Sequence, residues 1–405
     1  MGEPTPDPHA APSHAELVRT LREHAARLTA TLVALLGDVG AAEDLVQDAV
    51  ESALRRWPVD GIPDHPDAWL LTVARRRGID ILRRERTYRA KLAQLQWPVR
   101  AEPDDRLRLI FTCCHPALPR TAQIALTLRV VCGLTTAQIA SAFLVPEPTV
   151  ARRLTRAKRK ITEAAIPYRI PDADELPARL DEVLAVIYLM FNEAYLSSTA
   201  DAVHRPDLAA DAEWLAALLA ELMPTEPEVA GLLALIRLHR ARTPARFDTD
   251  GLILLRDQDR DRWNHDAIAE ATALLTRAAR RHRPGPYQLQ AALVACHAEA
   301  PSWADTDWPQ LLALYDMLLF LAPSPVTRLH RTIVSSYVHG PRRALTELDP
   351  LAPALDRYPL FHATRAELHR DLGETAAAQA ADERARELTA NPAQQSLLDQ
   401  RLEWG

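Results

Sequence analysis

The sequence predicts an all-α protein. Only 12 of its 405 residues are glycine, and aromatic residues make up 5% of the chain. Alanine and leucine, which favour helices, recur throughout. Apolar residues also return every three or four positions, which is the period of a helix with one buried face. The length allows two to four domains with sizeable cores.

Positive charge is concentrated in the first 165 residues. The net charge is −6, yet residues 75–100 contain nine arginines or lysines against two acids. This asymmetry favours a nucleic-acid-binding N-terminal half and a different role for the remainder.

The first 13 residues are rich in Pro, Ala and Asp. We predict that they are disordered, and they lack the basic-then-apolar pattern of a signal peptide. No stretch of the chain has the length of a membrane span. We therefore expect a soluble cytoplasmic protein.

Two helices follow, and the second has an acidic face. Residues 14–36 are predicted to form an amphipathic helix that ends near Gly37. In the next helix, residues 41–57, an apolar arc that includes Leu45, Ala49 and Trp57 lies opposite polar residues. The residues of this outward face are Asp44, Gln47, Asp48 and Glu51. Such a face is commonly just solvated.

A loop with three prolines and one glycine, residues 58–66, precedes a predicted helix over residues 67–86. The expected buried side includes Leu70, Leu71 and Ala74. The opposite side carries Trp69, Arg76, Asp80, Arg83 and Arg84. An exposed tryptophan beside arginines can stack an unpaired base and bind the backbone. Two alternatives are surface ion pairs of Asp80 and packing of Trp69 under a neighbouring helix.

A helix-turn-helix is predicted over residues 134–161, after a polar linker at 93–104 and a helix over 119–131. Its first helix begins at Thr135 or Thr136. Its second helix has Pro148 in the first turn and buries Val150 and Leu154. The opposite face carries Thr149, Arg152, Arg153, Arg156 and Lys160. A basic helix of this kind enters the DNA major groove, although a solvated charged face is the alternative.

No metal, cofactor or catalytic constellation is predicted. Cys113 and Cys114 adjoin His115, but adjacent residues cannot readily bind one tetrahedral ion, so we expect buried thiols. The acids between Asp257 and Asp261 lack the glycine and distal glutamate of a calcium loop. We therefore expect a protein that is not an enzyme.

Residues 166–405 are predicted to form a helical extension. Helices are expected at 180–195, 208–223 and 229–241. The polar segment 256–264 is predicted to be a structural network, with an acidic binding loop as the alternative. A hairpin of helices at 361–371 and 375–389 resembles a tetratricopeptide unit, and residues 308–348 resemble a degenerate preceding one. The two helices of the 361–389 hairpin are expected to pack closely at four small residues: Ala376, Ala377, Ala380 and Ala381. Such hairpins serve protein contact.

Three motifs in succession resemble an extracytoplasmic-function (ECF) sigma factor of bacterial RNA polymerase. They are Ala-Glu-Asp-Leu-Val-Gln-Asp at 42–48, Ala-Trp-Leu-Leu-Thr-Val-Ala-Arg at 68–75 with Ile-Asp-Ile-Leu-Arg-Arg at 79–84, and the helix-turn-helix. Further stretches, such as Phe-Thr-Cys-Cys-His-Pro at 111–116, Tyr-Leu-Met-Phe-Asn-Glu at 188–193 and Asp-Gln-Asp-Arg at 257–260, resemble a subgroup with a long C-terminal extension. The family commonly has Asn where Arg76 stands.

The resemblance implies a role for each part of the chain. Residues 14–92 would be region 2, 93–104 the linker and 105–165 region 4. The acidic face Asp44, Gln47, Asp48, Glu51 would bind core polymerase. The set Trp69, Arg76, Asp80, Arg83, Arg84 would bind the −10 element, and the basic face of the second helix would bind the −35 element.

Two functions therefore compete. The first is a sigma factor whose partners are core RNA polymerase and promoter DNA, and whose fused helical extension modulates its activity. That extension would bind a protein partner or the sigma domains themselves. The second is a helix-turn-helix regulator with a tetratricopeptide-like sensor that does not act as a sigma factor.

Overall fold

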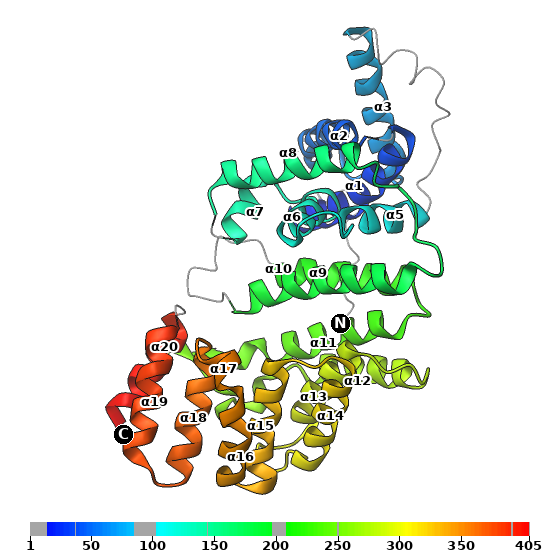
Figure 1. Ribbon diagram of the computed structural model, residues 1–405. Coiled ribbons are helices and arrows are strands. Elements are labelled where there is room, and N and C mark those ends of the chain that lie inside the picture. The colour runs from blue at the N-terminus through cyan, green and yellow to red at the C-terminus, as the bar shows by residue number, and fades with distance from the viewer. Residues whose placement is uncertain are drawn as a thin grey trace, which may run out of the picture. The chain divides into compact units, whose positions relative to one another are not determined.

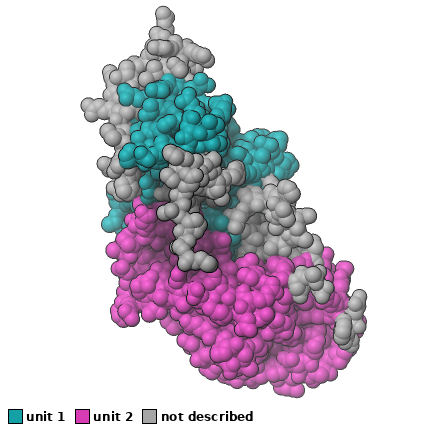
Figure 2. Space-filling view, turned by 180° about the vertical axis from the view of Figure 1, so that it is seen from behind, with its two compact units in different colours: residues 1–193, 204–211 teal, residues 194–203, 212–405 magenta. Residues whose placement is uncertain are grey.

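The computed structural model describes residues 14–36, 38–84, 103–143, 145–196, 208–248, 251–389 and 392–404. These residues are mostly helical, which confirms the all-α class (Figure 1). The chain forms two compact units, unit 1 (residues 1–193 and 204–211) and unit 2 (residues 194–203 and 212–405) (Figure 2). The segment 1–13, predicted to be disordered, lies outside the described residues.

Unit 1 carries the motifs that resemble a sigma factor. Its helices are α1 (His14–Leu36), α2 (Val39–Asp60), α3 (Pro66–Arg84), α5 (Pro103–Cys113), α6 (Arg120–Val130), α7 (Thr136–Ala142), α8 (Glu147–Glu163) and α9 (Leu176–Leu196). Helix α1 packs against α2, α3 and α5, whereas α8 packs against α6 and α7.

Helix α2 is longer than the sequence predicted. Its N-terminus is capped by the Asp38 carboxylate, which accepts hydrogen bonds from the amides of Gly40 at 2.7 Å and Ala41 at 3.1 Å. The expected end at Trp57 was wrong, because the helix continues through Pro58 to Asp60. A proline this close to a helix end removes only one hydrogen bond, so the last turn persists. The predicted loop is correspondingly shorter.

The helix-turn-helix forms as predicted. A capping box starts α7: the Thr135 hydroxyl accepts from the amide of Gln138, and the Gln138 side chain accepts from the amide of Thr135. Thr135 is therefore the capping residue. Ile139 of α7 and Leu154 of α8 are buried in the shared core. Helix α5 begins at Pro103, so the predicted linker is two residues too long; residues 93–102 lie outside the described part.

Helix α9 is bound to the helix-turn-helix part of unit 1. Arg120 forms an ion pair with Glu182 at 2.8 Å, and Arg179 donates to the carbonyl oxygen of Phe111 at 2.6 Å. The compact unit therefore continues past residue 166, where we predicted that the extension begins, to residue 193.

Unit 2 contains most of the helical extension. Its elements are α10 (Leu208–Leu222, in unit 2 from Ala212), α11 (Pro227–Ala241), η2 (Thr243–Ala245), β1 (Phe247–Asp248), β2 (Gly251–Leu252), η3 (Leu255–Asp257), η4 (Arg260–Arg262), α12 (His265–Ala279), α13 (Pro286–Glu299), α14 (Trp308–Leu321), α15 (Pro325–His339), α16 (Pro341–Leu348), η5 (Asp349–Leu351), α17 (Ala352–Leu355), α18 (Pro359–Asp371), α19 (Thr375–Leu388) and α20 (Pro392–Trp404). The sequence did not predict the short antiparallel ladder, in which Phe247 lies opposite Leu252.

Capping of α13 by a side chain of α11 depends on a glycine. A Cβ atom at Gly285 would lie 2.1 Å from Cδ of Glu228. The Glu228 carboxylate accepts hydrogen bonds from the amides of Tyr287 and Gln288 at 2.9 and 3.1 Å. It therefore caps α13 from a neighbouring helix, and only glycine leaves room for it.

The polar segment 256–264 is a structural network, as predicted. Arg260 donates to the carbonyl oxygens of His297 at 2.5 Å and Ala300 at 2.8 Å, so it caps the C-terminal end of α13. Arg256 forms an ion pair with Glu367 of α18 at 2.7 Å. Asn264 caps α12 through a hydrogen bond from the amide of Ala267 at 3.0 Å.

The hairpins predicted at 308–348 and 361–390 both form, as α14–α15 and α18–α19, and lie in one row (Figure 1). Gly373 has a φ of 75° in the turn before α19, a conformation that favours glycine. The predicted close-packing alanines were partly wrong. Ala376, Ala377 and Ala380 are exposed, whereas Ala381 is buried. The buried stripe is Ala378, Ala381 and Ala385, at the spacing of one helix face.

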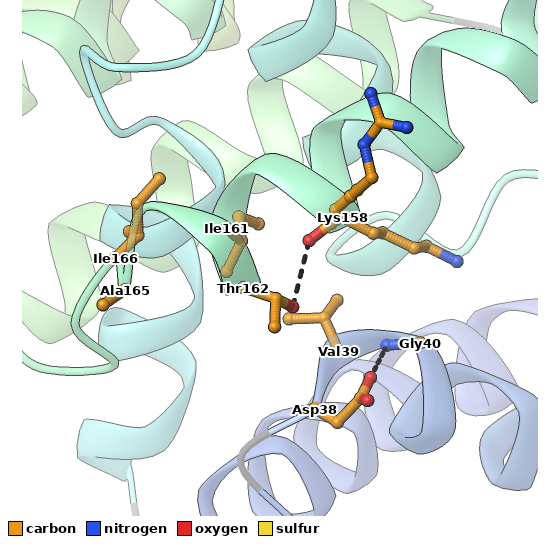
Figure 3. A pocket seen from close by; sticks show the side chains of 9 residues that line it. Asp38, Val39, Gly40, Lys158, Ile161, Thr162, Ala165 and Ile166 are labelled. Atoms are coloured by element: carbon orange, nitrogen blue, oxygen red, sulfur yellow. Dashed lines mark hydrogen bonds between the residues drawn. The ribbon is translucent and has the colours of Figure 1, made fainter.

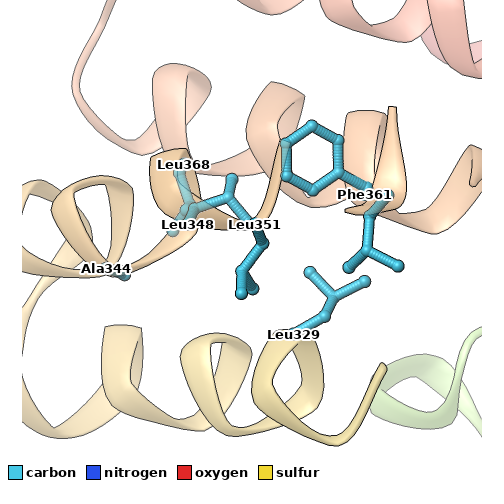
Figure 4. Packing of buried hydrophobic residues seen from close by; sticks show 7 residues of the cluster. Leu329, Ala344, Leu348, Leu351, Phe361 and Leu368 are labelled. Atoms are coloured by element: carbon cyan, nitrogen blue, oxygen red, sulfur yellow. The ribbon is translucent and has the colours of Figure 1, made fainter. Parts of the chain in front are cut away.

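A hydrophobic cluster joins the last hairpins. Phe361 is fully buried at the start of α18. It packs in one cluster with Leu329 of α15, Leu348 of α16 and Leu351 of η5 (Figure 4). Large apolar side chains in such a cluster stabilise the fold, because they are removed from water and pack closely with their neighbours.

We predict that Phe361→Ala destabilises the end of unit 2 by about 3–5 kcal/mol, because the cavity that it leaves cannot fully collapse. Hydrogen exchange of α15 and α18 in the full chain measures this loss. Phe320→Ala, at a side chain that is 87% exposed, is the control and should stay within about 0.5 kcal/mol. Equal protection in the two variants would contradict the assignment.

Candidate nucleic-acid interface

The predicted acidic face of α2 is only partly exposed to solvent. Asp44, Gln47 and Glu51 are exposed. Asp48 is half-buried because Arg77 of α3 donates to its carboxylate at 2.8 Å, a partner that the sequence did not reveal. Glu51 forms an ion pair with Arg55 of the same helix at 3.1 Å. Burial raises the pKa of Asp44, and the nearby charge of Lys158 opposes this shift.

Trp69 is not the exposed side chain that we expected. It is half-buried and meets the ring of Trp57 edge-on, with 5.4 Å between the ring centroids. Trp57 is itself fully buried in α2. The alternative that placed Trp69 against a neighbouring helix is therefore correct for part of its surface. Part of the Trp69 side chain still faces solvent.

The basic end of α3 is described only partly. Arg76 is exposed. Leu70 and Ala74 on the opposite side are buried as predicted, whereas Leu71, which was also predicted to be buried, is half-buried. The side chains of Asp80, Arg83 and Arg84 lie outside the described ones, so their predicted ion pairs and DNA contacts stay predictions.

Helix α8 separates an apolar stripe from a basic one. Val150, Leu154 and Ala157 are buried. On the other side Arg152, Arg156 and Lys160 are exposed, and Thr149 and Arg153 are half-buried. Nε of Arg152 donates to the carbonyl oxygen of Pro148 at 3.2 Å, which positions this side chain near the first turn of the helix. The helix therefore offers a row of positive charge along its outer side.

A buried carboxylate joins α2 to the helix-turn-helix, and sequence reasoning missed it. Glu43 is only 8% exposed. It forms ion pairs with Arg129 of α6 and with Lys158 of α8, the latter at 2.5 Å. A signal was present, because Glu43 shares a helical stripe with Val39 and Val46. An acid on such a stripe is stable only with a cationic partner.

The cysteines are buried in unit 1 as expected. Cys113 ends α5 and Cys114 follows it, both inside the core, and burial raises the pKa of the Cys114 thiol to about 12. Within the described residues, no group of three or more His, Cys, Asp or Glu side chains is arranged to hold a metal ion. In the same part of the chain, no helix is long and apolar enough to cross a membrane.

Two protein-family models match the part of the chain that contains these helices. The model of sigma-70 region 2 matches residues 20–88, and that of sigma-70 region 4 matches residues 108–161. The ECF RNA polymerase sigma factor SigL of Mycobacterium tuberculosis is 34% identical over 160 residues, which cover 38% of this chain and 90% of SigL. The chain belongs to the ECF sigma factors.

Other proteins and one further family are also similar to this sigma factor. The probable ECF RNA polymerase sigma factor SigI of the same organism is 30% identical over 36% of this chain and 54% of SigI. A Rhizobium meliloti protein described as uncharacterized is 41% identical over 89% of both chains. A family of unknown function, DUF6596, matches residues 179–279. No solved structure gave a significant match.

These matches decide between the two functions suggested by the sequence. Region 2 comprises α1 to α3, and region 4 comprises α5 to α8. A sigma factor binds core RNA polymerase and promoter DNA and directs transcription initiation, so the alternative of a regulator that is not a sigma factor is not favoured. Region 4 alone would suit either function, and region 2 is what distinguishes them.

Proposed function

We propose that this sigma factor divides its contacts among three helices of unit 1. The acidic face of α2 binds core polymerase, α3 with the preceding loop binds the −10 element as single strand, and α8 binds the −35 element as duplex. The observation that carries this proposal is the separation of charge: α2 exposes the acids Asp44 and Glu51 ahead of Arg55 and Arg56, whereas exposed arginines line α8. The protein acts in the cytoplasm, where both partners are found, and it acts by binding rather than by catalysis.

Each contact has a physical basis. Arginines on α8 bind phosphates and reach base edges in the major groove. Capture of unpaired −10 bases costs a few kcal/mol of unstacking, which aromatic and pocket contacts must offset. The half-buried ring of Trp69, supported by Trp57, is held in one orientation, and this reduces the entropy lost when a base stacks on it. Arg76 stands exposed on the same helix.

The extension, in our proposal, supports transcription through protein contact. It is fused to the sigma regions, so no separate inhibitor has to be displaced. Helix α14 exposes Met317, Phe320 and Leu321 on one face. Exposed apolar side chains at this spacing suit a protein partner, either core polymerase or the sigma regions themselves.

We predict that Arg152→Ala weakens binding to −35 duplex DNA by about 1–3 kcal/mol, because a base-reading arginine is lost. The control is Arg159→Ala on the same helix, where the arginine pairs with Glu163 instead. Fluorescence anisotropy at fixed salt measures both variants. Equal affinities would show that Arg152 does not read this element.

We predict that Asp44→Arg lowers affinity for core polymerase at least tenfold, because it reverses a charge in the centre of the acidic face. Asp60→Arg, the same change at the exposed end of α2, should bind core nearly as well as the wild type. Surface plasmon resonance with immobilised core enzyme gives both constants. Unchanged binding of Asp44→Arg would place the polymerase contact elsewhere.

A cut between α9 and α10 tests the extension. Removing everything after residue 170 would also remove α9, which is anchored in unit 1. We therefore suggest a protease site inserted between residues 197 and 207 of the full chain. We expect run-off transcription with core polymerase to fall after cleavage and separation of the fragments. An uncleaved sample with the same insertion is the control, and full activity of the separated N-terminal fragment would refute a positive role.

A further inference from the structure

A cluster of positive charge lies at the end of α12, in unit 2. Five of the seven residues from 277 to 283 can carry a positive charge, and all five are exposed: Arg277, Arg280, Arg281, His282 and Arg283. We call these residues the basic cluster. Like charges this close repel one another, and a single cation is enough to complement the C-terminal dipole of a helix. Helix stability therefore does not account for the basic cluster.

The loop that carries most of the basic cluster is fixed to the turn before α11. Arg283 forms an ion pair with Glu226 at 2.5 Å, and Arg281 donates to the carbonyl oxygen of Pro224 at 3.0 Å. His282 adopts a φ of 53°, a conformation that glycine reaches at lower cost. The tip of this fixed loop thus carries an imidazole, which can donate a hydrogen bond, where a glycine would be less strained.

The other two arginines of the basic cluster have no carboxylate partner among the described residues. Arg277 lies in the last turn of α12 and Arg280 directly follows the helix, so the two share one side of it. A cation at another cleft is engaged, by contrast. Lys158, which borders the cleft between α2 and α8, pairs with Glu43 (Figure 3).

A cleft of about 510 Å³ lies beside Arg277 and Arg280. The rest of its lining on α12 consists of small side chains, and Glu299 of α13 completes it: Ala269, Thr272, Ala273 and Thr276. The exposed Thr276 hydroxyl can donate to a phosphate oxygen. Because a short loop joins α12 to α13, the helices run in opposite directions, so Glu299 lies away from the arginine end.

We propose that the basic cluster binds the phosphate backbone of duplex DNA. Guanidinium groups bind phosphate oxygens in a bidentate manner, and hydroxyl and imidazole groups add further donors. The lining of the cleft contains no large apolar side chain of the kind that anchors a protein partner. The small side chains of α12 let a phosphate chain come close to the helix.

This contact does not depend on base sequence, because phosphates are the same at every step of the duplex. It goes beyond the proposed function, which assigns DNA contacts only to α3 with its preceding loop and to α8. The extension would thereby add affinity for any DNA that the sigma regions hold. The exposed apolar face of α14 is a separate surface.

The test measures binding of the full chain to a random-sequence duplex of about 40 base pairs, by fluorescence anisotropy between about 50 and 200 mM salt. We expect Arg277→Gln combined with Arg280→Gln to weaken binding about tenfold at the lowest salt. The magnitude of the salt slope should fall by about 2, since each lost phosphate contact removes roughly 0.9.

The matched control is Arg262→Gln combined with Arg357→Gln, which removes the same charge from two exposed arginines of unit 2 outside the basic cluster. It should bind DNA like the wild type. Equal affinities and salt slopes of the two double variants overturn the proposal, and so does a wild type that does not bind the duplex.

A cross-link identifies the partner. A photoreactive group is attached to Thr276→Cys in a Cys296→Ser background and irradiated with the same duplex and core polymerase both present. Thr276 is exposed in the cleft, and the remaining native cysteines are buried. We expect a cross-link to DNA. Cross-linking to a polymerase subunit, which would assign the cluster to protein contact, overturns the proposal, as does the absence of any cross-link.

Discussion

The ion pairs of Glu43 are the interaction on which unit 1 depends. Burial of a carboxylate that is 8% exposed is unfavourable without cationic partners, and here one cation comes from α6 and another from α8. Three helices from two regions are thereby fixed to one side chain. Unlike an apolar contact, this link is sensitive to the removal of a single charge, because the loss of one partner leaves a buried charge without compensation.

The positions of the other charged residues of unit 1 follow from helix geometry. Each helix buries one stripe and leaves the other side to charged residues. In α2 the outer side is acidic, and in α8 it is basic, so one compact unit offers surfaces of both signs. Some of these charges are already engaged within the chain: Arg77 binds Asp48, and Arg55 binds Glu51. Both pairs are solvent-accessible, so they contribute little stability and can be exchanged for a partner at small cost.

Unit 2 uses arginines for a different purpose. Glu367 of α18 binds Arg256 and Arg370, each at 2.7 Å, and Arg370 also binds the buried Asp382 of α19. Burial acts to raise the pKa of Glu367, but the hydrogen bond from Arg256 and the charges of its other arginine neighbours hold it below its usual value. This network links the polar segment that follows β2 to the last hairpin, which lies more than a hundred residues later.

The sequence by itself determined the helical class, the helix-turn-helix with its buried and basic stripes, and the hairpin at 361–390. Periodicity and capping residues act within one or two turns, so Thr135, Leu154 and Gly373 could be read locally. The motifs in succession also indicated the family. Tertiary structure alone decided that Trp69 packs on Trp57, that α9 belongs with region 4, and which alanines of α19 are buried.

The cationic partners of Glu43 were also decided by the tertiary structure alone. Its stripe in α2 showed that the residue faces inward, but the cations that neutralise it come from helices far along the chain. Sequence spacing reports which side of a helix is buried. It does not report which distant helix covers that side, because that choice depends on packing and charge between segments that meet only in the folded protein.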